Sequence, residues 1–204
     1  MAQITHSSTR EVHVKTLSVV IVGLAMGIGG LGPAGQESAS ATKAGALTRL
    51  MDQQKLDAVA ARDPDHPDRF VAALYYPGAR LLAVSASYPA APLLEQKIAA
   101  RKYRDVYMDL QVPATQQGRF FVMDLQANGL RKTRDGDAAF DITYENGGNQ
   151  VSFDGDWSRQ NMSKTLYDAR FKADDERYAK MLSALEHEMA RASTAASAVA
   201  KERR

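Results

Sequence analysis

The sequence predicts an α+β fold in which helices cover a mainly antiparallel sheet or a split barrel. Short apolar runs alternate with turn residues typical of hairpins, such as Pro77-Gly78 and Gly147-Gly148. Runs with helical periodicity precede, interrupt and follow these strands. The alternating strand–helix pattern and the Gly-rich phosphate loop of a nucleotide-binding parallel sheet are absent from the sequence.

The first half of the domain is expected to contain two helices and one hairpin. Apolar residues at spacings of three, four and seven predict an N-terminal helix over about 43–61, which Pro64 and Pro67 end. The segment 70–89 reads as a hairpin, and because both of its faces are apolar we expect it at the centre of the fold. A short middle helix follows over about 92–103.

The second half is expected to contain four strands and a long helix. Strands are predicted at 106–111 and 121–126, followed by a hairpin within 140–157. Ser163 is placed to cap the last helix. The helix has an apolar stripe of Tyr167, Phe171, Tyr178, Met181, Leu182, Leu185 and Met189. Residues 42–189 would thus form a single α+β domain, with the Ala-rich tail 190–204 frayed or disordered.

The N-terminal segment has the parts of a secretory signal peptide. Arg10 and Lys15 precede an uncharged, apolar run over 16–30, and small residues follow it. Ala39 and Ala41 lie three and one residues before a possible cleavage bond, so residues 1–41 are predicted to be removed. The alternative is a retained membrane anchor, but its strongly apolar core, Leu17–Ile28, is shorter than the roughly 20 residues that span hydrocarbon.

Composition limits the partners and the location of the mature protein. The chain has 204 residues with 26 Lys+Arg and 24 Asp+Glu, and this small net charge of +2 does not favour a nucleic-acid partner. There is no cysteine, so neither disulfides nor a lipid-modified cysteine is available. We therefore expect an exported protein, periplasmic or secreted, with no stable membrane span after cleavage.

The sequence has few histidines that could serve a zinc site or a Ser-His-Asp catalytic triad. Beyond the predicted leader only His66 and His187 remain, which excludes a zinc site built from several imidazoles or thiolates. Neither lies near a nucleophile turn of the G-x-S-x-G type. No cofactor is predicted from these residues.

The segment Val151–Trp157, "VSFDGDW", offers two carboxylates, Asp154 and Asp156, as weak candidates for a calcium site. An EF-hand loop that begins at Asp154 would need Gly at its sixth position and Glu at its twelfth, where the chain has Arg159 and Thr165. Asp-Gly is also a common dipeptide in tight turns. We therefore interpret the segment as structural and expect the Trp157 ring in the core.

Two strands end in the same "DLQ" triplet, which places Asp109 and Asp124 at matching positions. Such a pair could serve a glycosidase-like hydrolase, in which two carboxyl groups face each other across a cleft. The alternative is that both residues lie on the solvent faces of their strands.

The order of elements resembles the FMN-binding split barrels of the pyridoxamine-phosphate-oxidase-like group. The resemblance rests on "FVAALYYPGARLLAVSAS", "PLLEQKIAARKY", "RDVYMDL" and "RFFVMDL" and covers about 46–125. It implies a site for the flavin phosphate near Ser85 and Ser87, with Tyr107 as a further candidate and FMN as the cofactor. The segment that follows, "YPAAP", carries none of the basic residues of that family's phosphate site.

The sequence therefore leaves three functional hypotheses. The first is a non-catalytic binding or accessory module for an unknown small molecule or protein. The second is a split-barrel redox protein that binds flavin or haem. The third is a hydrolase that depends on Asp109 and Asp124.

Overall fold

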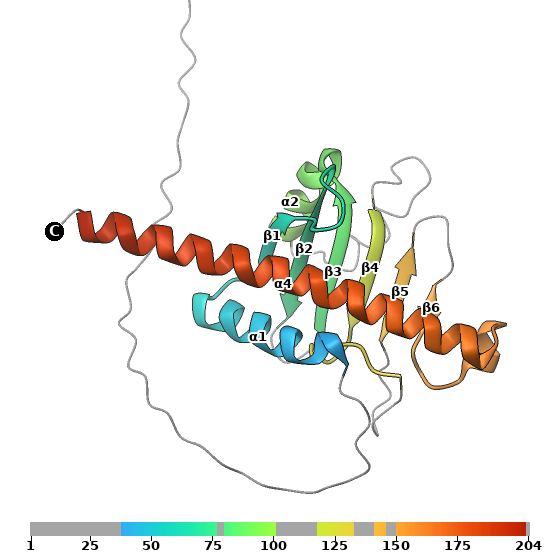
Figure 1. Cartoon of the computed structure of the whole chain (residues 1–204). Helices are drawn as coiled ribbons and strands as arrows, with labels where there is room; N and C mark the ends of the chain where they lie inside the picture. The colour runs from blue at the N-terminus through green and yellow to red at the C-terminus, as the bar shows by residue number, and fades with distance from the viewer. Residues whose placement is uncertain (1–37, 77–79, 101–117, 133–140, 146–149, 203–204) are drawn as a thin grey trace, which may run out of the picture.

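The protein has an α+β fold built on one antiparallel sheet (Figure 1). The computed structural model describes residues 38–76, 80–100, 118–132, 141–145 and 150–202. Within these ranges six strands pair in the order β1-β2-β3-β4-β5-β6, so that β1 and β6 lie at the two edges. The mainly antiparallel sheet is therefore confirmed.

Helices flank and interrupt the strands in chain order. The elements are α1 (Ala39–Gln54), β1 (Ala58–Arg62), β2 (Arg69–Tyr76), β3 (Arg80–Ser87), the 3₁₀ helix η1 (Tyr88–Ala90), α2 (Ala91–Ala99), β4 (Gly118–Asp124), β5 (Ile142–Glu145), β6 (Val151–Ser152), the 3₁₀ helix η2 (Trp157–Gln160) and α4 (Lys164–Glu202).

The N-terminal helix is shorter than the sequence predicts. It ends at Gln54, and Lys55 takes a left-handed conformation with φ of 53°. Ala58 and Val59, which we expected in the helix, instead begin strand β1 and pair with Leu74 and Ala73 of β2. The predicted extension to residue 61 is wrong because pairing with a neighbouring strand overrides the local helical spacing.

The central hairpin is confirmed. Strands β2 and β3 pair from Arg69↔Ser87 to Tyr76↔Arg80, and the interior of both strands is buried. β3 also pairs with β4, with a shift in register between Ser85 and Ala86. The hairpin thus lies inside the sheet, as its apolar faces predict.

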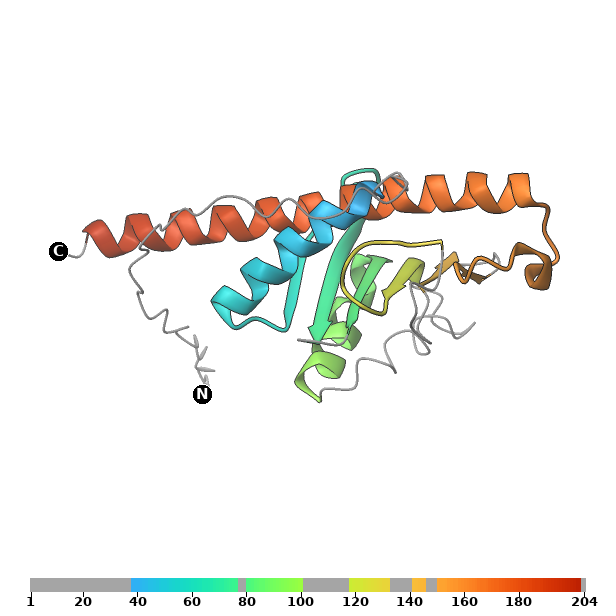
Figure 2. The ribbon, with the colours of Figure 1, turned by 90° about the horizontal axis from the view of Figure 1, so that it is seen from below.

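Each face of the sheet carries its own core. Helices α1 and α4 cover one face, and α2 lies on the other, as the two views together show (Figures 1 and 2). The α1/α4 side is centred on Leu47, Met51, Val71, Phe120, Phe153, Tyr178 and Leu182. The α2 side is centred on Phe70, Leu74, Val84, Leu94 and Phe121.

Helix α4 begins where the sequence predicts and ends later. The Ser163 hydroxyl accepts the Leu166 N–H at 3.2 Å, which confirms the cap. The helix runs to Glu202, about 58 Å from its start. We expected fraying from Ala190, but the helix continues, in keeping with the high helix propensity of alanine. Figure 1 shows its C-terminal part extending past the sheet.

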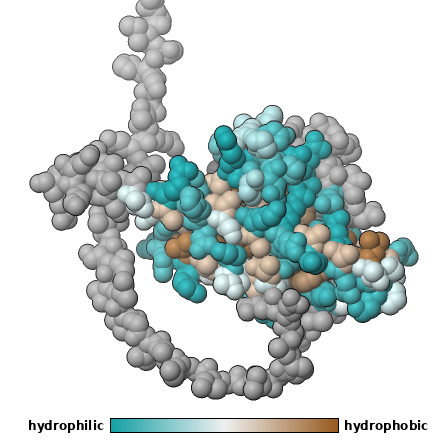
Figure 3. Space-filling view, viewed as in Figure 1, coloured by the Kyte–Doolittle hydropathy of each residue, from teal (hydrophilic) through white to brown (hydrophobic). Residues whose placement is uncertain are grey.

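The surface along α4 is mostly hydrophilic (Figure 3). Among the described residues, no helix combines the length and the apolar character needed to cross a bilayer. The predicted strand at 106–111 lies outside the described residues, as do the turns at 77–78 and 147–148.

Candidate functional site

Buried carboxylates gather on the side of the sheet that α1 and α4 cover. Five aspartates are at most 5% exposed: Asp63, Asp124, Asp141, Asp174 and Asp175. A buried carboxylate is costly unless it is paired or hydrogen-bonded. The partners of these five groups therefore decide between a structural and a chemical role.

Asp124 binds the main chain that follows β4. Its carboxylate accepts the N–H groups of Asn128 at 3.0 Å and Gly129 at 2.7 Å, and the Tyr178 hydroxyl at 3.2 Å. Burial raises the pKa of Asp124, while these donors act in the opposite direction. The carboxylate thus ties the connection after β4 to helix α4.

Asp141 binds the same connection from the other side. Its two oxygens accept the N–H groups of Leu125 at 3.0 Å and Arg131 at 2.8 Å. Burial, and next the nearby charge of Asp124, raise the pKa of Asp141 to about 7. We define residues 124–132, held between these two carboxylates, as the clamped loop.

Asp175 of α4 contacts the first turn of α1. One oxygen accepts the Ala39 N–H at 2.6 Å, and the other accepts the Ser40 N–H at 3.1 Å and the Ser40 hydroxyl at 2.6 Å. Ser40 Oγ in turn accepts the N–H of Leu130 in the clamped loop at 2.8 Å. The side chain of Ser38, the N-cap residue, makes no capping bond, so Asp175 satisfies the helix end instead.

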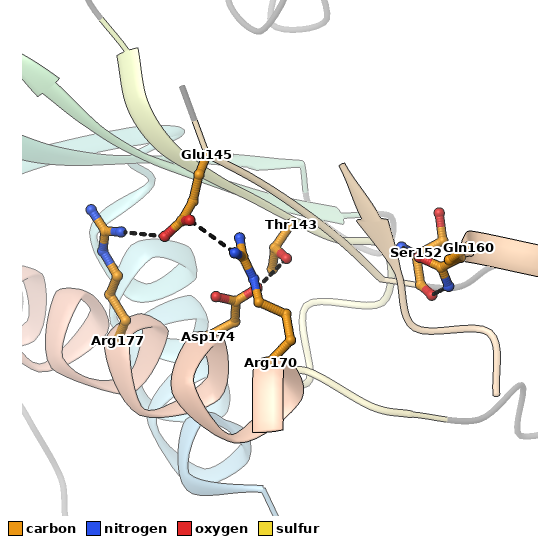
Figure 4. Close-up of polar contacts among 7 residues, drawn as sticks. All are labelled: Thr143, Glu145, Ser152, Gln160, Arg170, Asp174 and Arg177. Atoms are coloured by element: carbon orange, nitrogen blue, oxygen red, sulfur yellow. Dashed lines mark hydrogen bonds and ion pairs between the residues drawn. The ribbon is translucent and has the colours of Figure 1, made fainter. Parts of the chain in front are cut away.

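A charged network joins α4 to strand β5 (Figure 4). Arg170 and Arg177 both bind Glu145, at 2.8 and 3.2 Å. Arg170 also binds Asp174 at 2.8 Å, and the Thr143 hydroxyl donates to Asp174. These pairs link side chains one or two turns apart on α4 to neighbouring β5 residues, an arrangement that fixes the helix on the sheet.

The calcium candidates serve their own turn. Asp154 accepts the N–H of Asp156 at 2.9 Å, and Asp156 accepts the Ser158 hydroxyl at 2.6 Å and pairs with Arg159 at 2.7 Å. Among the described residues, no group of three or more His, Cys, Asp or Glu side chains could hold a metal ion. The two carboxylates thus bind groups of their own turn.

Trp157 does not occupy the core as expected. Its side chain is 39% exposed in η2, whereas Phe153 is fully buried and stacks edge-on against Tyr167 and Phe171. The prediction is wrong because the aromatic residue nearer to β6 reaches the core, while the 3₁₀ turn carries the indole outward.

The structure describes two of the three residues that the split-barrel resemblance implies. Ser85 is fully buried and donates its hydroxyl to Asp63, whose other oxygen accepts the N–H groups of Asp65 and His66. Ser87 is half-buried at the end of β3. Tyr107 lies outside the described residues. Ser85 is thus engaged in fixing the turn after β1.

Of the two carboxylates proposed for a hydrolase, Asp109 and Asp124, the structure describes only Asp124. Asp109 lies outside the described residues, and Asp124 is fully buried, not on a solvent face. The charge of Asp124 acts instead on the pKa of Asp141, a buried carboxylate that the sequence analysis missed. Asp175 and Ser40 were missed too, because their contact joins residues 135 positions apart and no local pattern marks it.

Ala39 and Ala41, the predicted cleavage residues, lie in the first turn of α1 on either side of Ser40. Ala39 is exposed and Ala41 is half-buried. The expected cleavage bond, Ala41–Thr42, is therefore a bond within α1.

A small hollow lies on the α2 side of the sheet. It measures about 50 Å³ and is lined by Phe121, Met123, Ile142, Tyr144 and Gln150. Ligand sites usually have volumes of about 300–1,000 Å³. The hollow is thus nearer in size to a few water molecules than to a flavin.

The described carboxylates and hydroxyls at the centre of the fold thus bind other parts of the same chain. Comparisons of the chain with protein-family models, curated proteins and solved structures give no match.

Proposed function

We propose that this protein is an exported, non-catalytic binding or accessory module that contacts a small molecule or a protein. One observation carries the proposal: each of the five buried aspartates accepts hydrogen bonds from within the chain. Groups used in this way hold the fold together and are not free to act on a substrate.

The argument against hydrolysis rests on access. A general acid must reach the leaving group of its substrate, within hydrogen-bond distance or through one water. Asp124 is fully buried and Asp141 is 5% exposed, and both lie beneath main-chain N–H groups that they bind. The raised pKa of Asp141 therefore follows from its burial in the fold.

A visible absorption spectrum of the purified full-length protein tests the proposal against the redox alternative. We expect no absorption band at wavelengths longer than those of the aromatic side chains. The same result is expected for a sample that is incubated with FMN and then dialysed. A flavin or haem band that survives dialysis would refute a cofactor-free module.

Asp124→Asn tests the proposal against hydrolysis. If a panel of chromogenic glycosides detects activity in the wild type, and Asp124→Asn abolishes it while the near-UV circular dichroism is unchanged, the module is an enzyme. We expect no turnover by either protein.

Export is the second part of the proposal, and it is supported by the leader-like composition of residues 1–41. The test is fractionation of a bacterial host that expresses the full chain. We expect the protein in the periplasmic or extracellular fraction. A full-length chain confined to the cytosol would refute export.

A further inference from the structure

The first turn of α1 is built into the fold by contacts from distant parts of the chain. Asp175, which is 5% exposed, accepts three hydrogen bonds from Ala39 and Ser40. Ser40 is fully buried, and its Oγ also accepts the Leu130 N–H. These residues precede the cleavage bond that the sequence predicts.

Gly129 shows how closely the clamped loop approaches this turn. Its φ of +85° is a conformation that favours glycine. A Cβ atom on Gly129 would lie 2.4 Å from both the Cα and the N of Ala41, and 2.8 Å from the carbonyl carbon of Ser40. Main chain therefore packs directly on main chain, and residues 40–41 complete this contact.

Cleavage after Ala41 would remove one side of the contact. Asp175 would lose all three of these donors, and the buried Leu130 N–H would lose its acceptor. Such groups are costly when they stay buried without partners. The domain that the structure describes thus begins before Thr42, at or upstream of Ser38.

We propose that the leader is removed at the Ala34–Gly35 bond, so that the mature chain begins at Gly35 and keeps the whole of α1. This inference rests on the proposed export. Gly32 and Ala34 are the small residues three and one positions before the bond, and only Leu31 separates them from the apolar run over 16–30. A signal peptidase would add water across the amide, which leaves a carboxylate on Ala34 and an amino group on Gly35.

Two variants distinguish the two bonds. Ala34→Phe places a bulky residue directly before the proposed bond, whereas Ala39→Phe does so three positions before Ala41–Thr42. Ala39 is exposed, so the fold tolerates the second change. The measurement is the intact mass of the full chain, expressed with a C-terminal tag in an exporting bacterial host.

We expect the wild type and Ala39→Phe to begin at Gly35, and Ala34→Phe to keep its leader. A wild-type chain that begins at Thr42, with processing blocked by Ala39→Phe, would overturn the proposed bond and leave export standing. A wild-type chain that stays whole in the cytosol would refute export and the cleavage together.

A second measurement tests the physical argument directly. Ser40→Ala removes the buried hydroxyl, whereas Ser38→Ala removes a hydroxyl that approaches Ser40 Oγ only at a marginal 3.5 Å. In the isolated protein we expect Ser40→Ala to lower the Tm by about 5–10 °C and Ser38→Ala by less than about 2 °C. Equal, small shifts would show that the first turn does not need its anchor, and would overturn the proposal.

Discussion

Replacing Asp175 with alanine removes the acceptor that holds the first turn of α1 to α4. The Ala39 and Ser40 N–H groups and the Ser40 hydroxyl all donate to it, at 2.6, 3.1 and 2.6 Å. Because Asp175 and Ser40 are both buried, water replaces these bonds poorly. We expect the free energy of unfolding to fall by about 3–5 kcal/mol.

The neighbouring residue provides a matched control. Glu176 is on the same turn of α4, its side chain is 58% exposed, and its pairing with Lys172 spans 3.9 Å. Removal of such a surface pair changes stability by less than about 1 kcal/mol. Glu176→Ala, like Asp175→Ala, removes one carboxylate, but it removes an exposed one in place of a buried one.

Urea denaturation, followed by circular dichroism, measures both variants. For a domain of this size the Asp175→Ala loss corresponds to a fall in Tm of about 6–20 °C. A double-mutant cycle with Ser40→Ala should give a coupling energy of about 1–2 kcal/mol. If Asp175→Ala behaved like Glu176→Ala, the contact between the two helices would not stabilise the protein, and the reasoning would fail.

Three further predictions follow from the same contacts. Gly129→Ala should cost about 2–4 kcal/mol in thermal or urea unfolding, whereas Gly45→Ala, with no atom within 4 Å of its Cβ, should stabilise α1 by about 0.5–1 kcal/mol; equal effects would contradict the close packing. Phe153→Ala should cost about 3–5 kcal/mol and Trp157→Ala clearly less, although the sequence analysis expects the Trp157 ring in the core. Because burial raises the pKa of Asp141 to about 7, the native state holds a proton that the unfolded state has already released. Stability should then fall by roughly 4 kcal/mol as the pH rises from about 4 to about 7, and Asp141→Asn should flatten this slope; stability that rises over that window would refute the assignment.

Much of the fold could be predicted from local patterns. The hairpin of β2 and β3 has apolar residues on both faces, and the start of α4 has both its cap and its stripe. The errors arose where tertiary contacts determine the secondary structure or the burial of a residue. The segment Ala58–Arg62 continues the spacing of a helix but pairs with β2. Trp157 was expected in the core, but its side chain is exposed and Phe153 is buried there.

The buried carboxylates could not be recognised in this way. Asp124 looked like a surface residue because a strand with period two usually turns its polar face to water. The helix that covers this face is distant in sequence, and nothing in the local pattern shows that Tyr178 or the N–H groups of Asn128 and Gly129 will bind Asp124. In the sequence Asp141 and Asp175 are ordinary aspartates. Only the fold brings the N–H groups of Leu125 and Arg131 to Asp141, and the first turn of α1 to Asp175.

Native-state hydrogen exchange in the clamped loop tests the central claim most directly. The N–H groups of Gly129, Leu130 and Arg131 donate to buried side-chain oxygens of Asp124, Ser40 and Asp141. If these side chains hold the fold together, we expect the three amides to exchange as slowly as the amides of β3, through global unfolding alone. Exchange near the rate of an exposed loop, while β3 stays protected, would contradict the structural role of the buried carboxylates.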